Sequence, residues 1–491
     1  MSFWPATIVG LVVLLAAAEG SRNKVHSFAI GWAFGFGQAV VSFNWLAQSF
    51  EYQSGLPQWT GLLAVPLLSA YLAVFPALAL MAARWVGPGH ATFRVLAFPG
   101  AWVILEWARG WLFTGFPWNP LGAIWIDVPV VAQSAQWVGA LGLSGLTALL
   151  AGSLFHFWRS HPATFSMQIA ALLLVHHMGR ENATEEGSSE LRVRVVQPNT
   201  GQDEKWRADL AQQQREKLLA LSGNPRGDGK TRLIFWPEAA IADDVERTQQ
   251  TKLQMAKILG PKDLLLTGAV TLTAGSSRQA PYATNSMFVI DSNATVLARY
   301  DKAHLVPFGE YVPAFAKWLG LSRFAAGSVD FKQGAGPGTL TLPGLPKIGV
   351  DICYEIIFPG NVTDPVDRPA FIFNPSNDAW FGRWGPPQHL VQARLRAIEE
   401  GLPVIRSTPT GISAIIRKDG SVAAQIPLNT PGYIEGDLPP AGEPTVFSRH
   451  GHLVAMSFAL LAMAAALIIG LRHRGRSKGL PLRWRTRFTI S

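Results

Sequence analysis

Long apolar segments fill the first third of this sequence and constrain its fold more than any other feature. Each is close to the ~20 residues that an α-helix needs to cross about 30 Å of hydrocarbon. A further segment of this kind lies near the C-terminus. We therefore predict helical membrane spans near residues 5–19, 27–46, 60–83, 93–113, 136–157, 162–178 and 452–471.

The composition agrees with a membrane protein. Hydrophobic residues make up 48% of the chain and charged residues 15%, which is more apolar than an ordinary soluble enzyme of 491 residues. The net charge is +9, but much of the excess lies in an acid-free tail from Arg472 to Arg487. The sequence has neither zinc-finger spacing nor a basic, aromatic-interleaved strand motif, so we expect no nucleic-acid partner.

The loop charges predict an orientation, because Lys and Arg accumulate in short cytoplasmic loops. Basic residues such as Arg22 and Arg84 follow alternate spans, whereas the loops 47–59 and 114–135 contain no Lys or Arg. This pattern places residues 180–450 outside the cytoplasm and the basic tail inside.

Two features of the fourth predicted span have more than one interpretation. Glu106 and Arg109 lie three residues apart, so they share a helical face and can neutralise each other. An intramembrane charge pair is a functional candidate, but a position near the outer end of the span favours a structural role. The run around Trp111, Trp118 and Trp125 is typical of an interfacial aromatic belt, and the floor of a lipid-access path is the alternative.

A polar linker begins near residue 181, and beyond it short apolar strands alternate with amphipathic helices. About 250 residues of this kind suffice for one α/β domain with its own core. We predict strands near 191–197, 232–236, 263–270, 284–291, 294–300, 347–352, 370–374, 403–407 and 412–417. We predict helices near 204–221, 244–258 and 389–400.

These patterns divide the chain into four parts. Residues 1–180 are expected to form about six membrane helices, and residues 191–440 an extracytoplasmic domain. A C-terminal membrane helix is predicted at 450–472, followed by a basic cytoplasmic tail at 473–491.

The chain has a single cysteine, Cys353, at the end of an apolar run. A lone thiol closes no intramolecular disulfide, and one cysteine is too few for a zinc or iron–sulfur site, so we expect no metal centre there. Packing, reactivity and intermolecular pairing remain. By residue type alone, a buried cysteine is most often a small hydrophobe.

Two other chemically useful residues also follow predicted strands, where loops commonly carry function. Glu238 comes directly after a strand that Pro237 ends, and Lys302 begins an extended loop that contains Glu310. With Cys353, they supply a base, a cation and a nucleophile.

A thiol reacts as its thiolate and ionises near pH ~8.5, so it needs a base or a nearby positive charge. Glu238 is the candidate base, and we expect burial to raise its pKa toward that of the thiol. Lys302 would favour the thiolate and stabilise the oxyanion formed on attack at an ester. A Cys–His dyad with His304 or His389 is the alternative.

At this point the sequence resembles the nitrilase superfamily and its Glu–Lys–Cys triad, and with helices on both sides of that domain it resembles the apolipoprotein N-acyltransferase family. The motifs that carry the resemblance are Thr114–Trp118, Trp236–Glu238, Lys302–Glu310, Ile352–Ile356 and Ser376–Gly382. The resemblance implies a polytopic α-helical membrane bundle plus an α/β nitrilase-like αββα sandwich. The family generally has eight spans, and this chain is expected to begin at what resembles the second.

The resemblance implies roles for single residues. Glu238 would be the general base, Lys302 the oxyanion stabiliser and Cys353 the nucleophile that becomes a thioester. The positions that would support the site or bind substrate are Glu310, Tyr354, Glu355 and Trp206. For Trp206, a helix-face aromatic is the alternative.

The resemblance also implies a ping-pong reaction. A membrane phospholipid would acylate Cys353, and the α-amine of the S-diacylglyceryl cysteine of an apolipoprotein would then accept the chain as an amide. No metal or other cofactor is required. We expect a monomer in the bacterial inner (cytoplasmic) membrane, with the catalytic domain in the periplasm. The alternatives are a membrane-tethered amidase or nitrilase that passes the thioester to water, and a lipid-binding or scaffold protein with an inactive nitrilase fold.

Overall fold

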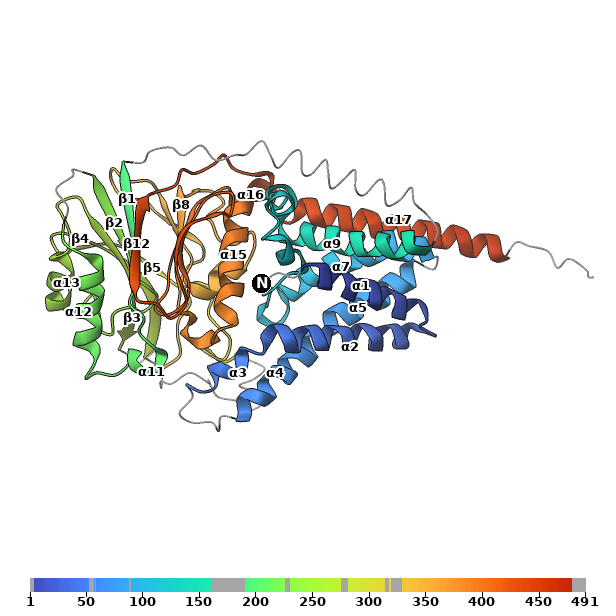
Figure 1. Cartoon of the computed structure of the whole chain (residues 1–491), viewed down its shortest axis with the longest axis horizontal. Helices are drawn as coiled ribbons and strands as arrows, with labels where there is room; N and C mark the ends of the chain where they lie inside the picture. Colours follow the sequence, from blue (N-terminus) through green and yellow to red (C-terminus); the bar gives the residue numbers. More distant parts are fainter. Residues whose placement is uncertain are drawn as a thin grey trace, which may run out of the picture.

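The structure, a computed structural model, describes residues 4–52, 57, 59–87, 90–159, 190–225, 230–274, 281–313, 318 and 329–478. Within these ranges, a bundle of apolar helices meets a two-sheet domain at one of its ends (Figure 1). This arrangement confirms the predicted fold class, a helical bundle joined to an αββα sandwich. The sixth predicted span, 162–178, lies outside the described residues.

The helices of the bundle follow the other predicted spans, with one difference. The third predicted span forms two helices that meet at Ala73, because Pro76 has no N–H to bond the carbonyl one turn earlier. The principal helices are α1 (Trp4–Glu19), α2 (Lys24–Phe43), α4 (Trp59–Leu72), α5 (Val74–Val86), α7 (Phe98–Arg109), α9 (Ala135–Arg159) and α17 (Leu453–Lys478). The short ones are α3 (Leu46–Ser49), α6 (His90–Thr92), η1 (Phe93–Ala97), η2 (Leu112–Thr114), η3 (Leu121–Trp125), α8 (Pro129–Ala132) and α16 (Val446–His450).

Three helical stretches of the described chain are long and apolar enough to cross a bilayer, namely Trp59–Val86, Ala135–His156 and Leu453–Arg472. A shorter apolar helix covers Trp4–Glu19. The number of membrane spans, seven, therefore remains a prediction, whereas the apolar character of the bundle is established.

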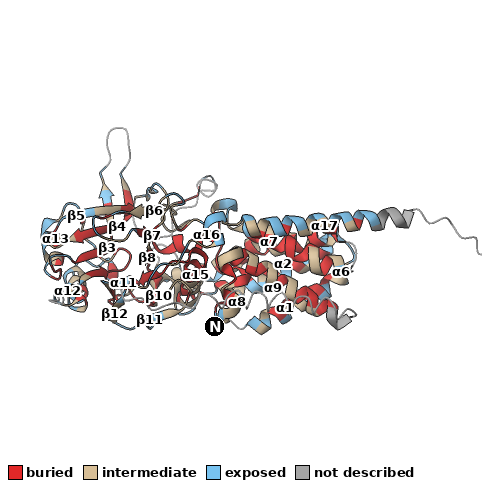
Figure 2. Cartoon of the chain, turned by 90° about the horizontal axis from the view of Figure 1, so that it is seen from above, coloured by how far each residue is buried: buried red, intermediate tan, exposed pale blue. Residues whose placement is uncertain are grey.

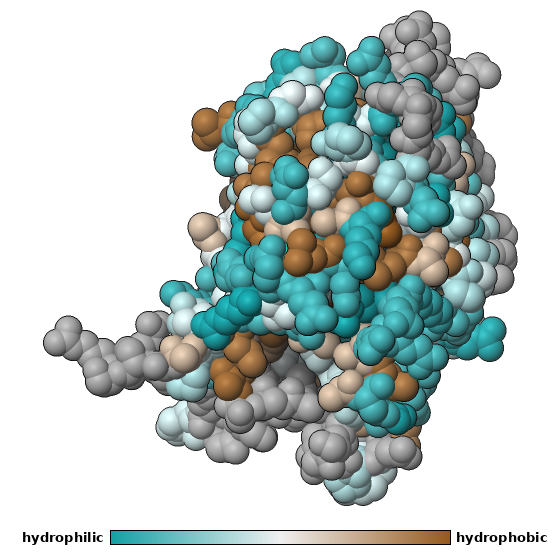
Figure 3. Space-filling model, turned by 90° about the vertical axis from the view of Figure 1, so that its left-hand side faces the viewer, coloured by the Kyte–Doolittle hydropathy of each residue, from teal (hydrophilic) through white to brown (hydrophobic). Residues whose placement is uncertain are grey.

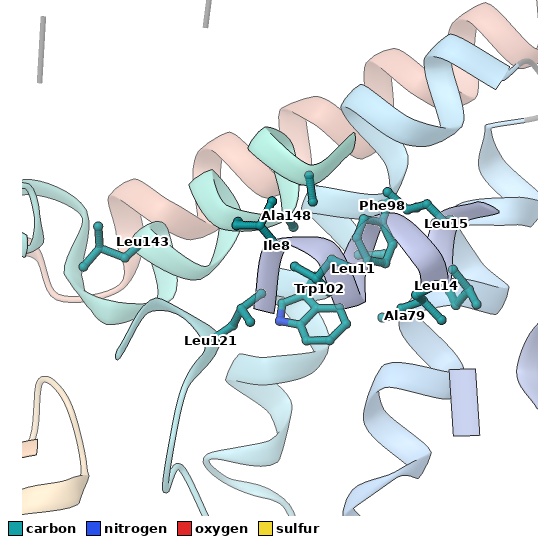
Figure 4. Packing of buried hydrophobic residues seen from close by; sticks show 14 of the residues in the cluster. Ile8, Leu11, Leu14, Leu15, Ala79, Phe98, Trp102, Leu121, Leu143 and Ala148 are labelled. Atoms are coloured by element: carbon teal, nitrogen blue, oxygen red, sulfur yellow. The ribbon is translucent and has the colours of Figure 1, made fainter. Parts of the chain in front are cut away.

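Small and large apolar side chains alternate in the core of the bundle. Leu11 of α1 and Phe98 of α7 are fully buried and lie beside Trp102, as Figure 4 shows. Apolar side chains also cover the outside of the bundle, and on α17 Phe458 and Leu461 are 67% and 66% exposed. An apolar surface of this kind requires a lipid environment, and Figure 2 shows the exposed residues running along α17.

The sandwich contains two sheets of six strands each. The first sheet has the order β12-β1-β2-β3-β4-β5, in which β1, β2 and β3 are parallel. Its strands are β1 (Leu191–Gln197), β2 (Thr231–Phe235), β3 (Leu264–Thr273), β4 (Tyr282–Asp291), β5 (Val296–Asp301) and β12 (Gly432–Asp437). The second has the order β11-β10-β9-β8-β7-β6, in which β7, β8 and β9 are parallel. Its strands are β6 (Gly338–Leu340), β7 (Ile348–Val350), β8 (Phe371–Pro375), β9 (Val404–Ser407), β10 (Ser413–Ile416) and β11 (Val422–Ile426).

Helices cover both outer faces of the sandwich (Figure 1). The helices α12 (Ala211–Ser222) and α13 (Gln249–Ala256) pack on the first sheet. The second sheet is covered by α15 (Gly385–Glu400), whose other side contacts the bundle. The nearly continuous apolar sequence of the central strands follows from this burial on both faces.

One predicted local element is wrong, and three strands were missed. The predicted helix 204–221 is interrupted after α11 (Gln202–Lys205), because the chain turns through residues 206–210 before α12 begins. The strands β6, β11 and β12 were not predicted, since they lie at sheet edges or are half exposed and lack an apolar run.

The end of the sandwich farthest from the bundle carries mostly hydrophilic residues, interrupted by apolar patches (Figure 3). This surface contrasts with the apolar outside of the helices. The two ends of the molecule therefore suit different solvents, water at one and lipid at the other.

Candidate active site

Cys353 lies at the carboxyl end of β7, where the chain enters the short helix η4 (Cys353–Ile357). Its φ of 53° is in the left-handed region, which a residue with a Cβ adopts only under strain. The side chain is buried, with 5% exposed. A tight turn of this kind holds the thiol in one direction at the end of the strand.

Glu238 stands at the corresponding end of β2, after Trp236 and Pro237. Its Oε1 accepts hydrogen bonds from Asn285 Nδ2 at 2.7 Å and Lys302 Nζ at 3.2 Å. The neighbouring strand must approach this turn closely: a Cβ on Gly268 would lie 2.9 Å from the Cα of Glu238. The glycine therefore makes room for the backbone of the turn that carries Glu238.

Lys302 follows β5 and is 1% exposed. Its ammonium lies between two carboxylates, 3.2 Å from Glu238 Oε1 and 2.9 Å from Glu310 Oε1. The structure thus brings the predicted base and cation into direct contact, with Glu310 as the second carboxylate partner of the lysine.

The pKa values of this cluster differ from our expectation. Burial raises the pKa of Glu238, but Lys302 and Lys205 outweigh it and hold the pKa below its usual range. The predicted rise is wrong because burial was considered without these two ammonium groups. Burial and the Glu238 carboxylate hold the pKa of the Cys353 thiol well above its usual range, although Lys302 opposes them. The resting site is therefore a thiol beside a carboxylate.

Lys205 was not singled out in the sequence, yet it belongs to the site. It is the last residue of α11, is 7% exposed, and its Nζ donates to the backbone oxygen of Glu238 at 2.9 Å. Burial lowers the pKa of Lys205 to about 8, although Glu238 and Cys353 oppose that shift. In sequence, a lysine after Asp203 and Glu204 reads as a solvated charge, so no local signal marks it.

Asn285 on β4 was also missed. Its Nδ2 donates to Glu238 at 2.7 Å and to Glu310 at 3.0 Å, and its backbone oxygen accepts from Lys302 N at 2.8 Å. A polar residue inside an otherwise apolar strand was the available signal.

Glu355 connects, by hydrogen bonds, the loop that begins at Lys302 to the turn that carries Cys353. Its Oε1 accepts from Ala303 N at 2.7 Å, His304 N at 3.0 Å and Tyr300 Oη at 3.0 Å, and its Oε2 accepts from Ile352 N at 2.7 Å. Burial raises the pKa of Glu355 to about 7, against these backbone donors. The predicted supporting position is thus a clamp between two loops of the site.

The other predicted supporting residues differ in position. Tyr354 is buried and its hydroxyl donates to the oxygen of Gly115 in the bundle at 3.1 Å. Trp206 is 53% exposed, and Lys205 Nζ lies 5.7 Å from the centroid of its ring. Trp206 therefore lies at the rim of the buried cluster.

The described contacts do not form the alternative Cys–His dyad. His304 stacks on Phe358 with 3.8 Å between ring centroids. His389 Nε2 lies 3.1 Å from the backbone oxygen of Cys353 and not against its sulfur. Burial lowers the pKa of both imidazoles, to about 4 for His304.

Glu106 and Arg109 form the predicted charge pair in the bundle. Their side chains lie 3.6 Å apart, and Glu106 Oε1 accepts from Leu121 N at 2.8 Å, which fixes the start of η3. As for metal sites, no group of three His, Cys, Asp or Glu side chains in the described ranges could hold an ion.

The geometry supports covalent acyl chemistry. A thiol on a strained turn faces a buried carboxylate and two ammonium groups, and the backbone N–H of Asn377 is directed at the sulfur. Such groups can accept the thiol proton and stabilise the negative oxygen of a tetrahedral intermediate.

Comparisons with known proteins identify both halves. Residues 1–153 match the apolipoprotein N-acyltransferase N-terminal domain, and residues 192–443 match the carbon-nitrogen hydrolase domain. The apolipoprotein N-acyltransferase of Rhodopseudomonas palustris is 33% identical, over 95% of this chain and 91% of the relative. That of Allorhizobium ampelinum is 35% identical, over 94% of this chain and 91% of the relative.

A nitrilase-superfamily protein of Saccharomyces cerevisiae aligns in structure with a TM-score of 0.37 and 16% identity, over 62% of this chain and 100% of that chain. The assignment rests on the sequence relatives, which extend over nearly the whole chain. The chain therefore belongs to the apolipoprotein N-acyltransferase family and is an acyltransferase with a nitrilase-like domain.

Proposed function

We propose that this protein moves a fatty acyl chain from a membrane phospholipid to the N-terminal amine of a diacylglyceryl apolipoprotein, through a thioester on Cys353. The observation that carries the proposal is the buried contact of Glu238 with Lys302 beside Cys353, in a domain seated on apolar helices. The names of the relatives supply the acceptor class.

In the first half-reaction, Glu238 takes the proton of the Cys353 thiol as the sulfur attacks the ester carbonyl. Lys302 stabilises the resulting oxyanion, because its ammonium charge acts on the negative charge that develops in the transition state. The intermediate collapses to the thioester, and Glu238 returns the proton to the departing glycerol oxygen. The lysophospholipid then leaves as a neutral alcohol at that position.

The low pKa of Glu238 and the high pKa of Cys353 make proton transfer unfavourable in the resting site. Transfer becomes favourable only as negative charge moves from sulfur to the substrate oxygen near Lys302. A thiol that stays protonated without substrate is protected from alkylation and oxidation.

In the second half-reaction, the acceptor ammonium loses one proton to solvent and the free amine attacks the thioester. Glu238 takes a second proton from that nitrogen and delivers it to the Cys353 sulfur. The products are the amide and the original thiol, so the cycle closes. No metal or cofactor enters either step.

The contacts of the bundle support the proposed orientation. Near one end of α9, Ala140 N donates to Glu399 of the sandwich at 2.6 Å, and near the other His156 lies 3.1 Å from Arg94. At that second end Lys24 also lies over the ring of Trp85, at 4.8 Å. The basic loops thus gather opposite the sandwich, as expected if they face the cytoplasm and the sandwich the periplasm.

We further propose the four-part division of the chain at 1–180, 191–440, 450–472 and 473–491, and a location in the bacterial inner membrane. We also propose that a single copy is active, because Glu238, Lys302 and Cys353 all come from one chain.

The test follows the fate of the acyl chain. Purified protein in phospholipid vesicles is given a diacylglyceryl-cysteine peptide, and mass spectrometry compares amide product with free fatty acid. We expect the amide to form faster than fatty acid, and Cys353→Ala to form neither. Fatty acid as the main product in the presence of peptide would identify a hydrolase and reject the transferase.

A further inference from the structure

Gln388 on α15 connects the sandwich to the helical half of the molecule, which consists of the bundle and the loops between its helices. Its Oε1 faces three N–H donors of the helical half, and its own Nε2 donates to a backbone oxygen there. The contacts are Trp45 Nε1 at 3.2 Å, Trp118 Nε1 at 2.9 Å, Asn119 Nδ2 at 2.8 Å and Ser42 O at 3.1 Å. The hydrogen bonds of this one side chain therefore depend on how the two halves are placed relative to each other.

The next residue, His389, contacts the nucleophile. Its ring is fully buried and its Nε2 lies 3.1 Å from the carbonyl oxygen of Cys353. A carbonyl oxygen only accepts, so Nε2 carries the hydrogen. On the other side, Nδ1 accepts from Arg406 Nη2 at 3.1 Å, and the same Nη2 donates to Asp378 Oδ1 and Oδ2 at 2.8 and 2.7 Å, which places Oδ1 2.8 Å from the ring nitrogen.

The hydrogen bond from His389 acts on a strained part of the backbone, the carbonyl of Cys353. With φ at 53°, the residue is held in a conformation that costs about 1–3 kcal/mol for a side chain with a Cβ. A hydrogen bond to this carbonyl fixes the following peptide plane and opposes relaxation of the turn. Relaxation would rotate the sulfur away from Glu238.

Trp118 contacts both Gln388 and His389. Its indole nitrogen binds Gln388, and its ring lies 5.1 Å from the His389 ring, between centroids. Trp118 is 1% exposed, and its ring packs between Trp45 of the helical half at 4.9 Å and Phe381 of the sandwich at 5.4 Å, between centroids. A change in that packing reaches both residues at once.

We propose that Gln388 and His389 couple the seating of the catalytic domain on the membrane helices to the backbone conformation of Cys353. In this scheme His389 is a positioning residue. Thioester formation is fast only when the helical half holds Trp118 and Gln388 in place. The inference rests on the proposed function, because its readout is acylation of Cys353.

The first test changes His389 alone. His389→Phe keeps an aromatic ring but has no donor for the Cys353 carbonyl, whereas His389→Gln keeps a donor at similar reach. We expect single-turnover acylation to slow about tenfold or more in His389→Phe, because this variant loses the donor to the Cys353 carbonyl together with the Nδ1 contacts to Asp378 and Arg406. We expect partial recovery in His389→Gln and an unchanged KM for phospholipid in both.

The second test asks whether Gln388 acts on Cys353 through His389. Gln388→Met removes the amide, and Gln392→Leu, one turn further on α15, is the matched control. The buried Gln392 amide has no hydrogen-bond partner among the described residues. We expect Gln388→Met to slow acylation about fivefold and the control less than twofold. We also expect the double variant Gln388→Met/His389→Phe to be less impaired than the product of the two single effects.

Three results separate the outcomes. Independent effects in the double variant, or wild-type acylation in His389→Phe, would overturn the coupling. Equal effects of Gln388→Met and Gln392→Leu would overturn it as well. If His389→Phe fails to fold in a thermal unfolding assay, the same comparison is made with His389→Leu, which also lacks a donor. Absence of acylation in the wild type would instead reject the proposed function.

Discussion

Replacing Lys302 by methionine would leave Glu238 and Glu310 buried without the cation that lies between them. The ammonium is 1% exposed and lies 3.2 and 2.9 Å from the two carboxylates, so solvent does not screen the pair. Breaking a buried ion pair in this way costs about 3–5 kcal/mol. For a domain of this size we expect Tm to fall by roughly 10 °C at pH 7.

The sign of the pH dependence makes this prediction specific. In the wild type, the pKa of Glu238 is lowered, so its stabilisation is present above the unfolded-state pKa and is lost as pH falls through the folded-state pKa. Without Lys302, the largest interaction that opposes burial is lost and only Lys205 and Asn285 remain, so we expect the Glu238 pKa to rise above its unfolded value. The variant should then become less stable as pH rises through that folded-state pKa, which is the reverse of the wild type.

The assay is thermal unfolding from pH 4 to 8 in detergent, together with Lys347→Met as a control. Lys347 pairs with Asp367 at the surface, with 45% of its side chain exposed, and an exposed pair contributes about 0–1 kcal/mol. We expect the control to follow the wild type. A Lys302→Met profile parallel to the wild type would refute the argument that Lys302 sets the charge of Glu238.

Three further changes test the surroundings of the site. Gly268→Ala places a Cβ against the Glu238 turn, so acylation should fall at least tenfold, whereas Gly436→Ala, which has room for a Cβ, should leave acylation unchanged. The lowered pKa of Lys205 means that wild-type stability should rise from pH 8 to about 10.5, as the unfolded state alone stays protonated, and Lys205→Met should flatten that rise in Tm. Tyr354→Phe loses one bond to the bundle and should slow acylation by about three- to tenfold at unchanged fold, as circular dichroism would check.

The fold could be predicted where a residue pattern carries it. The central strands β2, β3 and β8 are apolar runs bounded by turn residues, and the spans of the bundle are long apolar segments. The edge strand β6 has only three half-buried residues, and β12 is half exposed and pairs with β1, which is distant in sequence, so neither has such a pattern.

The site could be predicted in part for the same reason. Glu238, Lys302 and Cys353 follow strands, and the resemblance linked them. Lys205 and Asn285 reach the cluster only through the fold, and their sequence neighbours give no sign of it. The pKa of Glu238 was mispredicted because it depends on Lys302 and Lys205 as well as on burial, and nothing in the sequence placed Lys205 near this carboxylate.

The most direct test of the account is the mass of the intact protein after incubation with phospholipid alone. We predict one added acyl chain on Cys353 that hydroxylamine removes, and no addition in Cys353→Ser. Absence of the adduct in the wild type, together with acylation of a diacylglyceryl peptide by Cys353→Ser, would contradict the thioester mechanism.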